Sequence, residues 1–96
     1  MTVDIEKALR KAMKTGKVYL GSKRTVKALK KGEVKLVVIA SNCPEEIKKK
    51  IEGYEIPVVE FKGTNMDLGA VCGKPFSVAA LAVIDEGESE ILNVKI

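Results

Sequence analysis

The sequence has no histidine and no tryptophan, and its only aromatic residues are two Tyr and two Phe. Without histidine, imidazole acid–base catalysis and imidazole metal sites are excluded. The two cysteines, Cys43 and Cys72, form no CxxC motif, so zinc-ribbon and thioredoxin-like sites lack their signature. We expect both thiols to be small, buried apolar groups in a reducing compartment. The residues therefore indicate no cofactor and no metal.

Long apolar runs are also missing, and none approaches the roughly 20 residues that a membrane-spanning helix needs. The first residues, MTVDIEKALRK, have an amphipathic pattern instead of the features of a signal peptide. These absences predict a cytoplasmic protein with no membrane partner.

What is present is typical of a soluble globular domain: 96 residues, of which 46% are apolar and 31% charged. We expect residues 1–96 to form a single domain. The net charge of +4 conceals an asymmetry, because residues 1–50 carry 14 Lys or Arg against 5 Asp or Glu, and residues 51–96 carry 3 against 8. A basic half of this kind favours a polyanion as the partner.

Helix and strand patterns alternate along the chain. We expect helices at about 3–15, from Gly21 or Ser22 to Gly32, from Pro44 to Gly53, and from Thr64 to about Gly73; strands are expected at 18–20, 36–40, 56–61 and 78–85, with a fifth, polar edge strand in 87–96. Alternation predicts a three-layer α/β/α sandwich with a mixed, mostly parallel central sheet of four to five strands. The tight DEGE turn predicts that the last two strands form an antiparallel pair.

The stretch GSKRTVKALKKG, residues 21–32, is the first candidate site. It lacks the GK[ST] of a phosphate-binding loop, so nucleotide hydrolysis is rejected. A helix that begins there exposes backbone N–H groups and positive potential. Lys23, Arg24 and Lys27 add cations at the end where cations oppose the helix dipole, which favours a phosphate or base-edge site over a merely solvated face. For Lys30 and Lys31, a solvated face is the simpler interpretation.

Two other loops should lie at the same edge of the sheet. Asn42, which follows the second strand, could bond a base edge or simply be a helix cap. Phe76 stands in a loop beside Lys74, which suits stacking on an unpaired base; alternatively, it closes the core.

Three stretches together carry a resemblance to a known family: LGSKRTVKALKKGEVKLVVIASN, EFKGTNMDLGAVCGKPFSVAALAVID and GESEIL. Across nearly all of its length, the chain resembles the archaeal and eukaryotic large-subunit ribosomal proteins of the L-thirty-e family, part of the kink-turn RNA-binding superfamily. The resemblance implies an α/β/α sandwich, no catalytic activity, residence on the ribosome, and binding to a sharply bent internal loop of ribosomal RNA with tandem sheared G·A pairs. Other ribosomal proteins would be neighbours, and the free protein would be a monomer.

The resemblance also implies where the RNA is contacted. Gly21, Lys23 and the rest of the helix start would contact the RNA backbone and the G·A stem, Asn42 would reach the same region, and Phe76 would stack on an exposed base with Val78 nearby. The complete expected set is Gly21, Ser22, Lys23, Arg24, Thr25, Lys27, Asn42, Lys74, Phe76 and Val78.

One departure separates this chain from part of the superfamily. Members that guide RNA modification carry an Asn-Glu pair where this chain has Lys23-Arg24. The change favours the ribosomal branch, but a non-ribosomal RNA-processing subunit remains an alternative. A small metabolite-binding or enzymatic α/β domain is the alternative from another class.

Overall fold

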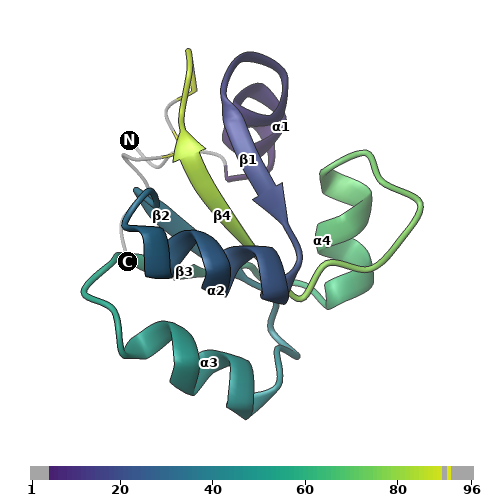
Figure 1. Cartoon of the computed structure of the whole chain (residues 1–96). Helices are drawn as coiled ribbons and strands as arrows, with labels where there is room; N and C mark the ends of the chain where they lie inside the picture. Colours follow the sequence, from purple (N-terminus) through teal and green to yellow (C-terminus); the bar gives the residue numbers. More distant parts are fainter. Residues whose placement is uncertain (1–4, 90, 92–96) are drawn as a thin grey trace.

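Helices and strands alternate along the chain in the computed structural model, which describes residues 5–89 and 91 (Figure 1). The elements of that described part are α1 (Ile5–Thr15), β1 (Lys17–Leu20), α2 (Ser22–Lys31), β2 (Leu36–Ile39), α3 (Glu45–Glu52), β3 (Val58–Glu60), α4 (Asn65–Val71) and β4 (Ala80–Asp85). The predicted α/β class and the predicted order of elements are confirmed.

The four strands form one mixed sheet in the order β1-β4-β2-β3. β4 is antiparallel to both β1 and β2, whereas β2 and β3 are parallel. Three strands therefore share one direction and the sheet is mixed, as predicted, but its pairing is not mostly parallel. Because the single reversed strand lies between two of them, two of the three pairings are antiparallel.

The last strand was expected to pair with a fifth strand through the DEGE turn. In the structure β4 has β1 on one side and β2 on the other. The expected antiparallel pairing of β4 with a fifth strand is therefore wrong. The predicted fifth strand itself, in 87–96, lies largely outside the described residues.

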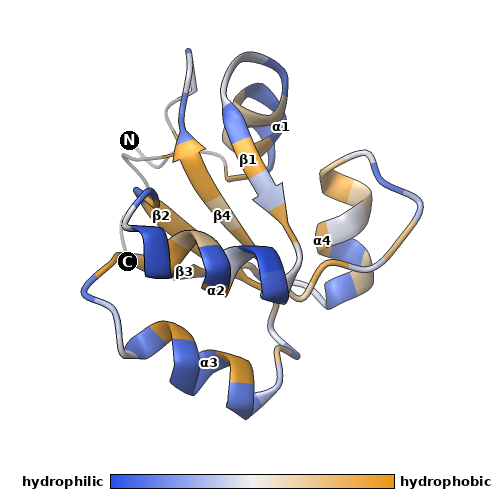
Figure 2. Ribbon diagram, viewed as in Figure 1, coloured by the Kyte–Doolittle hydropathy of each residue, from blue (hydrophilic) through white to orange (hydrophobic). Residues whose placement is uncertain are grey.

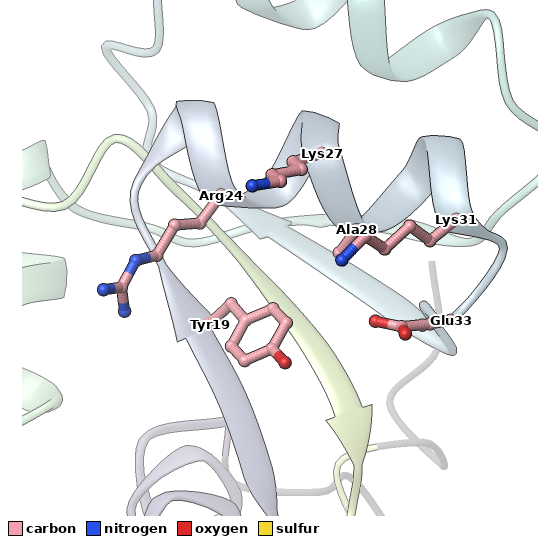
Figure 3. Close-up of a pocket in the computed structure, with 6 residues that line it drawn as sticks. All are labelled: Tyr19, Arg24, Lys27, Ala28, Lys31 and Glu33. Atoms are coloured by element: carbon pink, nitrogen blue, oxygen red, sulfur yellow. The ribbon is translucent and has the colours of Figure 1, made fainter.

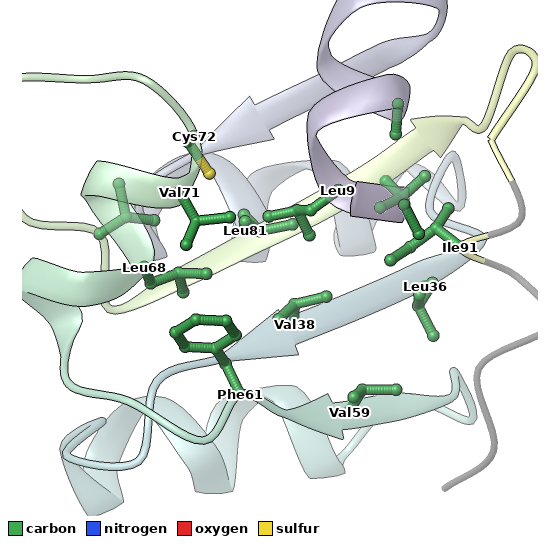
Figure 4. Close-up of a cluster of buried hydrophobic side chains, with 14 of the residues drawn as sticks. Leu9, Leu36, Val38, Val59, Phe61, Leu68, Val71, Cys72, Leu81 and Ile91 are labelled. Carbon is green, nitrogen blue, oxygen red and sulfur yellow. The ribbon is translucent and has the colours of Figure 1, made fainter. Parts of the chain in front are cut away.

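Helices cover both faces of the sheet, which confirms the three-layer sandwich (Figure 1). Alternate residues of the fully buried β2 point to opposite faces. Leu36 and Val38 belong to the cluster packed by α1 and α4 (Figure 4). Val37 and Ile39 belong to the cluster packed by α2 and α3. In Figure 2, β2, β3 and β4 are mainly hydrophobic, whereas the helices that cover them are hydrophilic over much of their surface.

Two strands begin later than predicted. The third begins at Val58 instead of residue 56, because the Ile56 N–H donates to the carbonyl of Tyr54 within a turn. The fourth begins at Ala80 instead of residue 78, because the Val78 N–H donates to the carbonyl of Asn65 in α4. That second contact fixes the loop that follows α4.

Candidate nucleic-acid interface

Three segments that are distant in sequence meet at one edge of the sheet, the one where β1 and β2 end and β4 begins. The start of α2 is joined to β4 by the Gly21 N–H, which donates to the Ala80 carbonyl at 2.9 Å. The end of β2 is joined to the same strand by the Ala40 N–H, which donates to Ala79 at 2.8 Å. The helix start, the loop after β2 and the loop before β4 are therefore neighbours, as the sequence predicted.

The first turn of α2 is open. Its N-cap is Gly21 at φ +104°, a backbone conformation that suits glycine, and no side chain caps the helix. The first turn also contains no acidic residue, whereas α3 begins with two Glu and α4 has a complete Thr64–Asp67 capping box. The N–H groups that begin a helix have no partner within it, so this end presents donors and positive potential.

Cationic side chains surround this open turn. Lys23, Arg24 and Lys27 are all exposed. None of the α2 cations forms an ion pair with another residue in the described part of the chain. The helix start is thus a concentrated positive site that no carboxylate in that part neutralises.

Thr25, another residue of the predicted set, is fully buried. Its Oγ1 donates to the carbonyl of Gly21 at 2.8 Å. The side chain is therefore positioned to hold the turn between Gly21 and α2, and it has no accessible surface of its own. Ser22, the first helical residue, is partly exposed at the rim of the turn.

Asn42 ties the loop after β2 to the start of α4. Its Nδ2 donates to Asn65 Oδ1 at 3.0 Å, and its Oδ1 accepts from the Asn65 backbone N–H at 2.8 Å. The predicted alternative that Asn42 is a helix cap holds for α4 and not for the next helix, α3, which has Pro44 at its N-cap and no side-chain cap. The asparagine instead satisfies the first N–H of α4, across the site.

The loop 73–78 lies directly on α4. Besides the Val78 contact, the Lys74 N–H donates to the Gly69 carbonyl at 3.0 Å. A side chain at Gly69 would not fit, since a Cβ there would lie 2.0 Å from the backbone oxygen of Phe76. Glycine at this position lets the loop backbone pack directly against the helix.

This close approach leaves Phe76 on the surface, where 54% of its area is exposed. The alternative that Phe76 closes the core is therefore wrong. Lys74 and Pro75 lie beside it around an open hollow of about 360 Å³ that also includes Met66. Val78, by contrast, is 1% exposed and packs in the core, so it anchors the end of the loop.

Two residues that lie at this site, Asn65 and Met66, are absent from the predicted set. Met66 is 74% exposed and shares the hollow with Phe76. The exposure of Met66 could be predicted from helical spacing, because Leu68 and Val71 face the core and position 66 falls on the opposite side of α4. The role of Asn65 has no such signal, since its partner is 23 residues away.

A second basic surface runs between α2 and α3. We call it the lysine groove: it has a volume of about 230 Å³ and is lined by Ser22, Lys23, Val26, Lys27, Lys30, Ile47 and Lys50. Lys30 thus contributes to a continuous basic surface with the helix start. The basic half of the sequence does not form one face, however, because α1 lies in the opposite layer.

The two thiols are buried, as expected. Burial raises the pKa of Cys72 to about 11, although Lys74 opposes the shift. The pKa of Cys43 is also raised, mainly by burial, with Lys48 acting against it. Among the described residues, no group of His, Cys, Asp and Glu could hold a metal ion, and no helix is both long and apolar enough to span a bilayer.

Comparison with known proteins connects this geometry to a family. The sequence profile described as "Ribosomal protein L7Ae/L30e/S12e/Gadd45 family" matches residues 3–93. The chain is 54% identical to the large ribosomal subunit protein eL30 of Methanosarcina mazei, over 96% of this chain and 89% of that one. It is 53% identical to the protein of the same name from Methanothermobacter thermautotrophicus, over 96% of this chain and 98% of the other.

A solved structure has the same fold. It is that of a protein with unknown function from Bacillus halodurans, which superposes with a TM-score of 0.78 at 29% identity and covers 95% of this chain and 94% of its own. The family match over almost the entire length, together with relatives at about half identity, is decisive. This chain belongs to the Ribosomal protein L7Ae/L30e/S12e/Gadd45 family.

Proposed function

We propose that this protein is a structural constituent of the large ribosomal subunit, resident on cytoplasmic ribosomes, and that it binds a kink-turn of ribosomal RNA. Its relatives are named as large ribosomal subunit proteins, which supports a structural role without catalysis. RNA would be held at the edge of the sheet where the start of α2, the loop after β2 and the loop 73–78 meet.

The observation that carries the proposal is that two complementary features lie on segments joined to the same strand, β4. The open, cationic first turn of α2 offers backbone donors and charges to phosphates. The exposed ring of Phe76 lies in the loop that enters β4, the strand bonded to Gly21. A bent RNA loop presents phosphates and unstacked bases close together, and both kinds of contact are then available at once.

We propose a role for each predicted residue that fits its place in the fold. Lys23, Arg24 and Lys27 would contact phosphates, with the amides at Ser22 and its neighbours, while Phe76 would stack on a base beside Lys74. Gly21, Thr25 and Val78 would shape the backbone that carries these contacts, because Thr25 and Val78 are buried. Asn42 would hold the edge together through Asn65, and a direct contact from it to RNA is still a prediction.

A non-ribosomal RNA-processing role is the alternative within the same class. The Lys23-Arg24 pair and the names of the relatives favour the ribosome. No observation in the described residues favours a metabolite-binding or enzymatic role. Co-sedimentation with large ribosomal subunits separates the ribosomal role from the non-ribosomal one.

The binding proposal is tested by a gel-shift titration at two salt concentrations, with a kink-turn RNA and a fully paired duplex of equal length. We expect tight binding to the kink-turn alone. The affinity should fall as salt rises, because bound cations release counterions from the RNA. Equal, salt-sensitive binding to both RNAs would show a generic basic surface and would contradict the proposal.

A further inference from the structure

A separate hollow lies between α2 and the edge strand β1, on the side of α2 away from the lysine groove. We call it the Tyr19 hollow: it has a volume of about 290 Å³ and is lined by Tyr19, Arg24, Lys27, Ala28, Lys31 and Glu33. In Figure 3 the Tyr19 ring lies below the helix, with Arg24 toward one end and Lys31 and Glu33 toward the other. The hollow therefore combines a ring face, cations and one carboxylate.

The Tyr19 ring lies among cations. This setting suits a nucleotide, which combines an aromatic base with an anionic phosphate. Tyr19 is only partly buried, and Lys17 Nζ lies 5.2 Å from its ring centroid. Lys31 and Arg24 are exposed and form no ion pair with another described residue. A base stacked near an aromatic ring with its phosphate between cations is the usual way in which proteins bind unpaired nucleotides.

The lysine groove and the Tyr19 hollow are lined by different kinds of side chain. The lysine groove has four lysines above two aliphatic side chains, without a ring and without a carboxylate. Such a surface suits the RNA backbone and cannot distinguish bases. The two hollows share Lys27, so α2 separates a backbone-type surface from a surface equipped for a base.

Glu33 supports a base over a simple anion. Its carboxylate would repel an isolated phosphate, yet it points into the hollow in Figure 3. Carboxylates accept hydrogen bonds from the exocyclic amino groups of bases. An acid beside cations and a ring is therefore complementary to a whole nucleotide, with an amino-bearing base on the Tyr19 ring within reach of Glu33 and Lys31 and a phosphate near Arg24 at the other end.

We propose that the Tyr19 hollow binds an unpaired, amino-bearing nucleotide of RNA that flanks the segment held at the sheet edge. The inference rests on the proposed function for the identity of the ligand as RNA. Continuity supports it, because Arg24 and Lys27 belong both to the open start of α2 and to the lining of the hollow. RNA bound at the helix start could continue along α2, which is roughly 15 Å long.

The test is an NMR titration of the isotopically labelled protein with hexa-adenylate. We expect amide shifts at Tyr19, Lys31 and Glu33. Tyr19→Leu keeps the apolar contact with α2 but removes the ring, and should weaken hexa-adenylate binding about fivefold or more, as loss of one stacked base does. Lys31→Ser should also weaken it. The matched control, Lys49→Ser, removes an exposed lysine of α3 that lines neither hollow and should preserve the Tyr19 shifts.

Parallel titrations separate the other ligands. Hexa-uridylate lacks exocyclic amino groups and should bind more weakly than hexa-adenylate, and Glu33→Gln should reduce that difference. Equal binding of hexa-glutamate would mark a generic polyanion surface and overturn the proposal, as would shifts that avoid Tyr19.

A kink-turn RNA is titrated in the same experiments to keep the two proposals apart. Tyr19→Leu should bind a kink-turn without single-stranded extensions as wild type does. Failure of wild type to bind the kink-turn would refute the proposed function, whereas normal kink-turn binding without hexa-adenylate shifts at Tyr19 would refute only this inference.

Discussion

At the scale of single residues, the two phenylalanines have opposite environments for physical reasons. Phe61 follows Val59 at the two-residue spacing of a strand and is 4% exposed in the core (Figure 4). Phe76 belongs to a loop whose backbone lies directly on Gly69, and more than half of its surface is exposed. Together with the exposed Met66 in the same hollow, the ring forms an apolar surface patch of the kind that marks an interaction site.

We therefore predict that Phe76→Ala weakens binding to a kink-turn RNA by roughly 1–3 kcal/mol, the usual cost of losing one stacked base. Stability should change little, because the ring is mostly outside the core. Fluorescence-detected RNA titration and urea unfolding measure the two effects. Phe76→Tyr, which keeps the ring, is the control and should retain most of the affinity. An unchanged affinity for Phe76→Ala would show that the ring does not stack on RNA.

At the scale of secondary-structure elements, the site depends on how α4 is connected to its neighbours. The capping box at Thr64 and Asp67 closes its N-terminus locally. The pair of hydrogen bonds between Asn42 and Asn65 then ties that same end to the loop after β2. Because α4 also supports the loop 73–78, the pair fixes the position of Phe76 relative to the β2 end of the edge.

Asn42→Ala removes both hydrogen bonds, and we predict a loss of about 0.5–2 kcal/mol in the free energy of unfolding, as for loss of a helix cap. Urea unfolding measures it. Asn42→Asp keeps the acceptor for the Asn65 N–H and should preserve most of that stability, while its negative charge should lower RNA affinity. An identical urea midpoint for Asn42→Ala and wild type would rule out a stabilising role for the pair.

At the scale of the whole molecule, stability rests on two apolar clusters, one on each face of the sheet. Cys72 belongs to the cluster under α1 and α4 and is 7% exposed. Burial disfavours the thiolate and raises the pKa to about 11, from 9.0 for an unperturbed thiol. The folded protein therefore holds this proton more tightly than the unfolded chain does.

Stability should accordingly depend on pH in the alkaline range. The contribution from the protonated Cys72 is complete below about pH 9 and is lost as the pH rises toward about 11. Urea unfolding of wild type and Cys72→Ala at pH 8, 10 and 11 measures it. The difference in stability between them should shrink as the pH rises; a difference that stays constant across this range would mean that the thiol does not titrate in the folded protein.

The sequence by itself determined the class of fold, the order of the elements and the open, basic start of α2. These features depend on local rules, namely apolar periodicity, glycine at helix ends and cations without nearby acids, and such rules act over a few residues. The family is also carried by stretches that can be read directly along the chain.

Only the tertiary structure decided which residues are accessible and which are joined across the site. The burial of Thr25, the exposure of Phe76 and the bonds between Asn42 and Asn65 depend on contacts between segments far apart in the chain. The same is true of the central place of β4, since pairing partners are set by the packing of both helical layers. Local patterns predict an element, whereas its neighbours are fixed by how all the apolar faces are buried together.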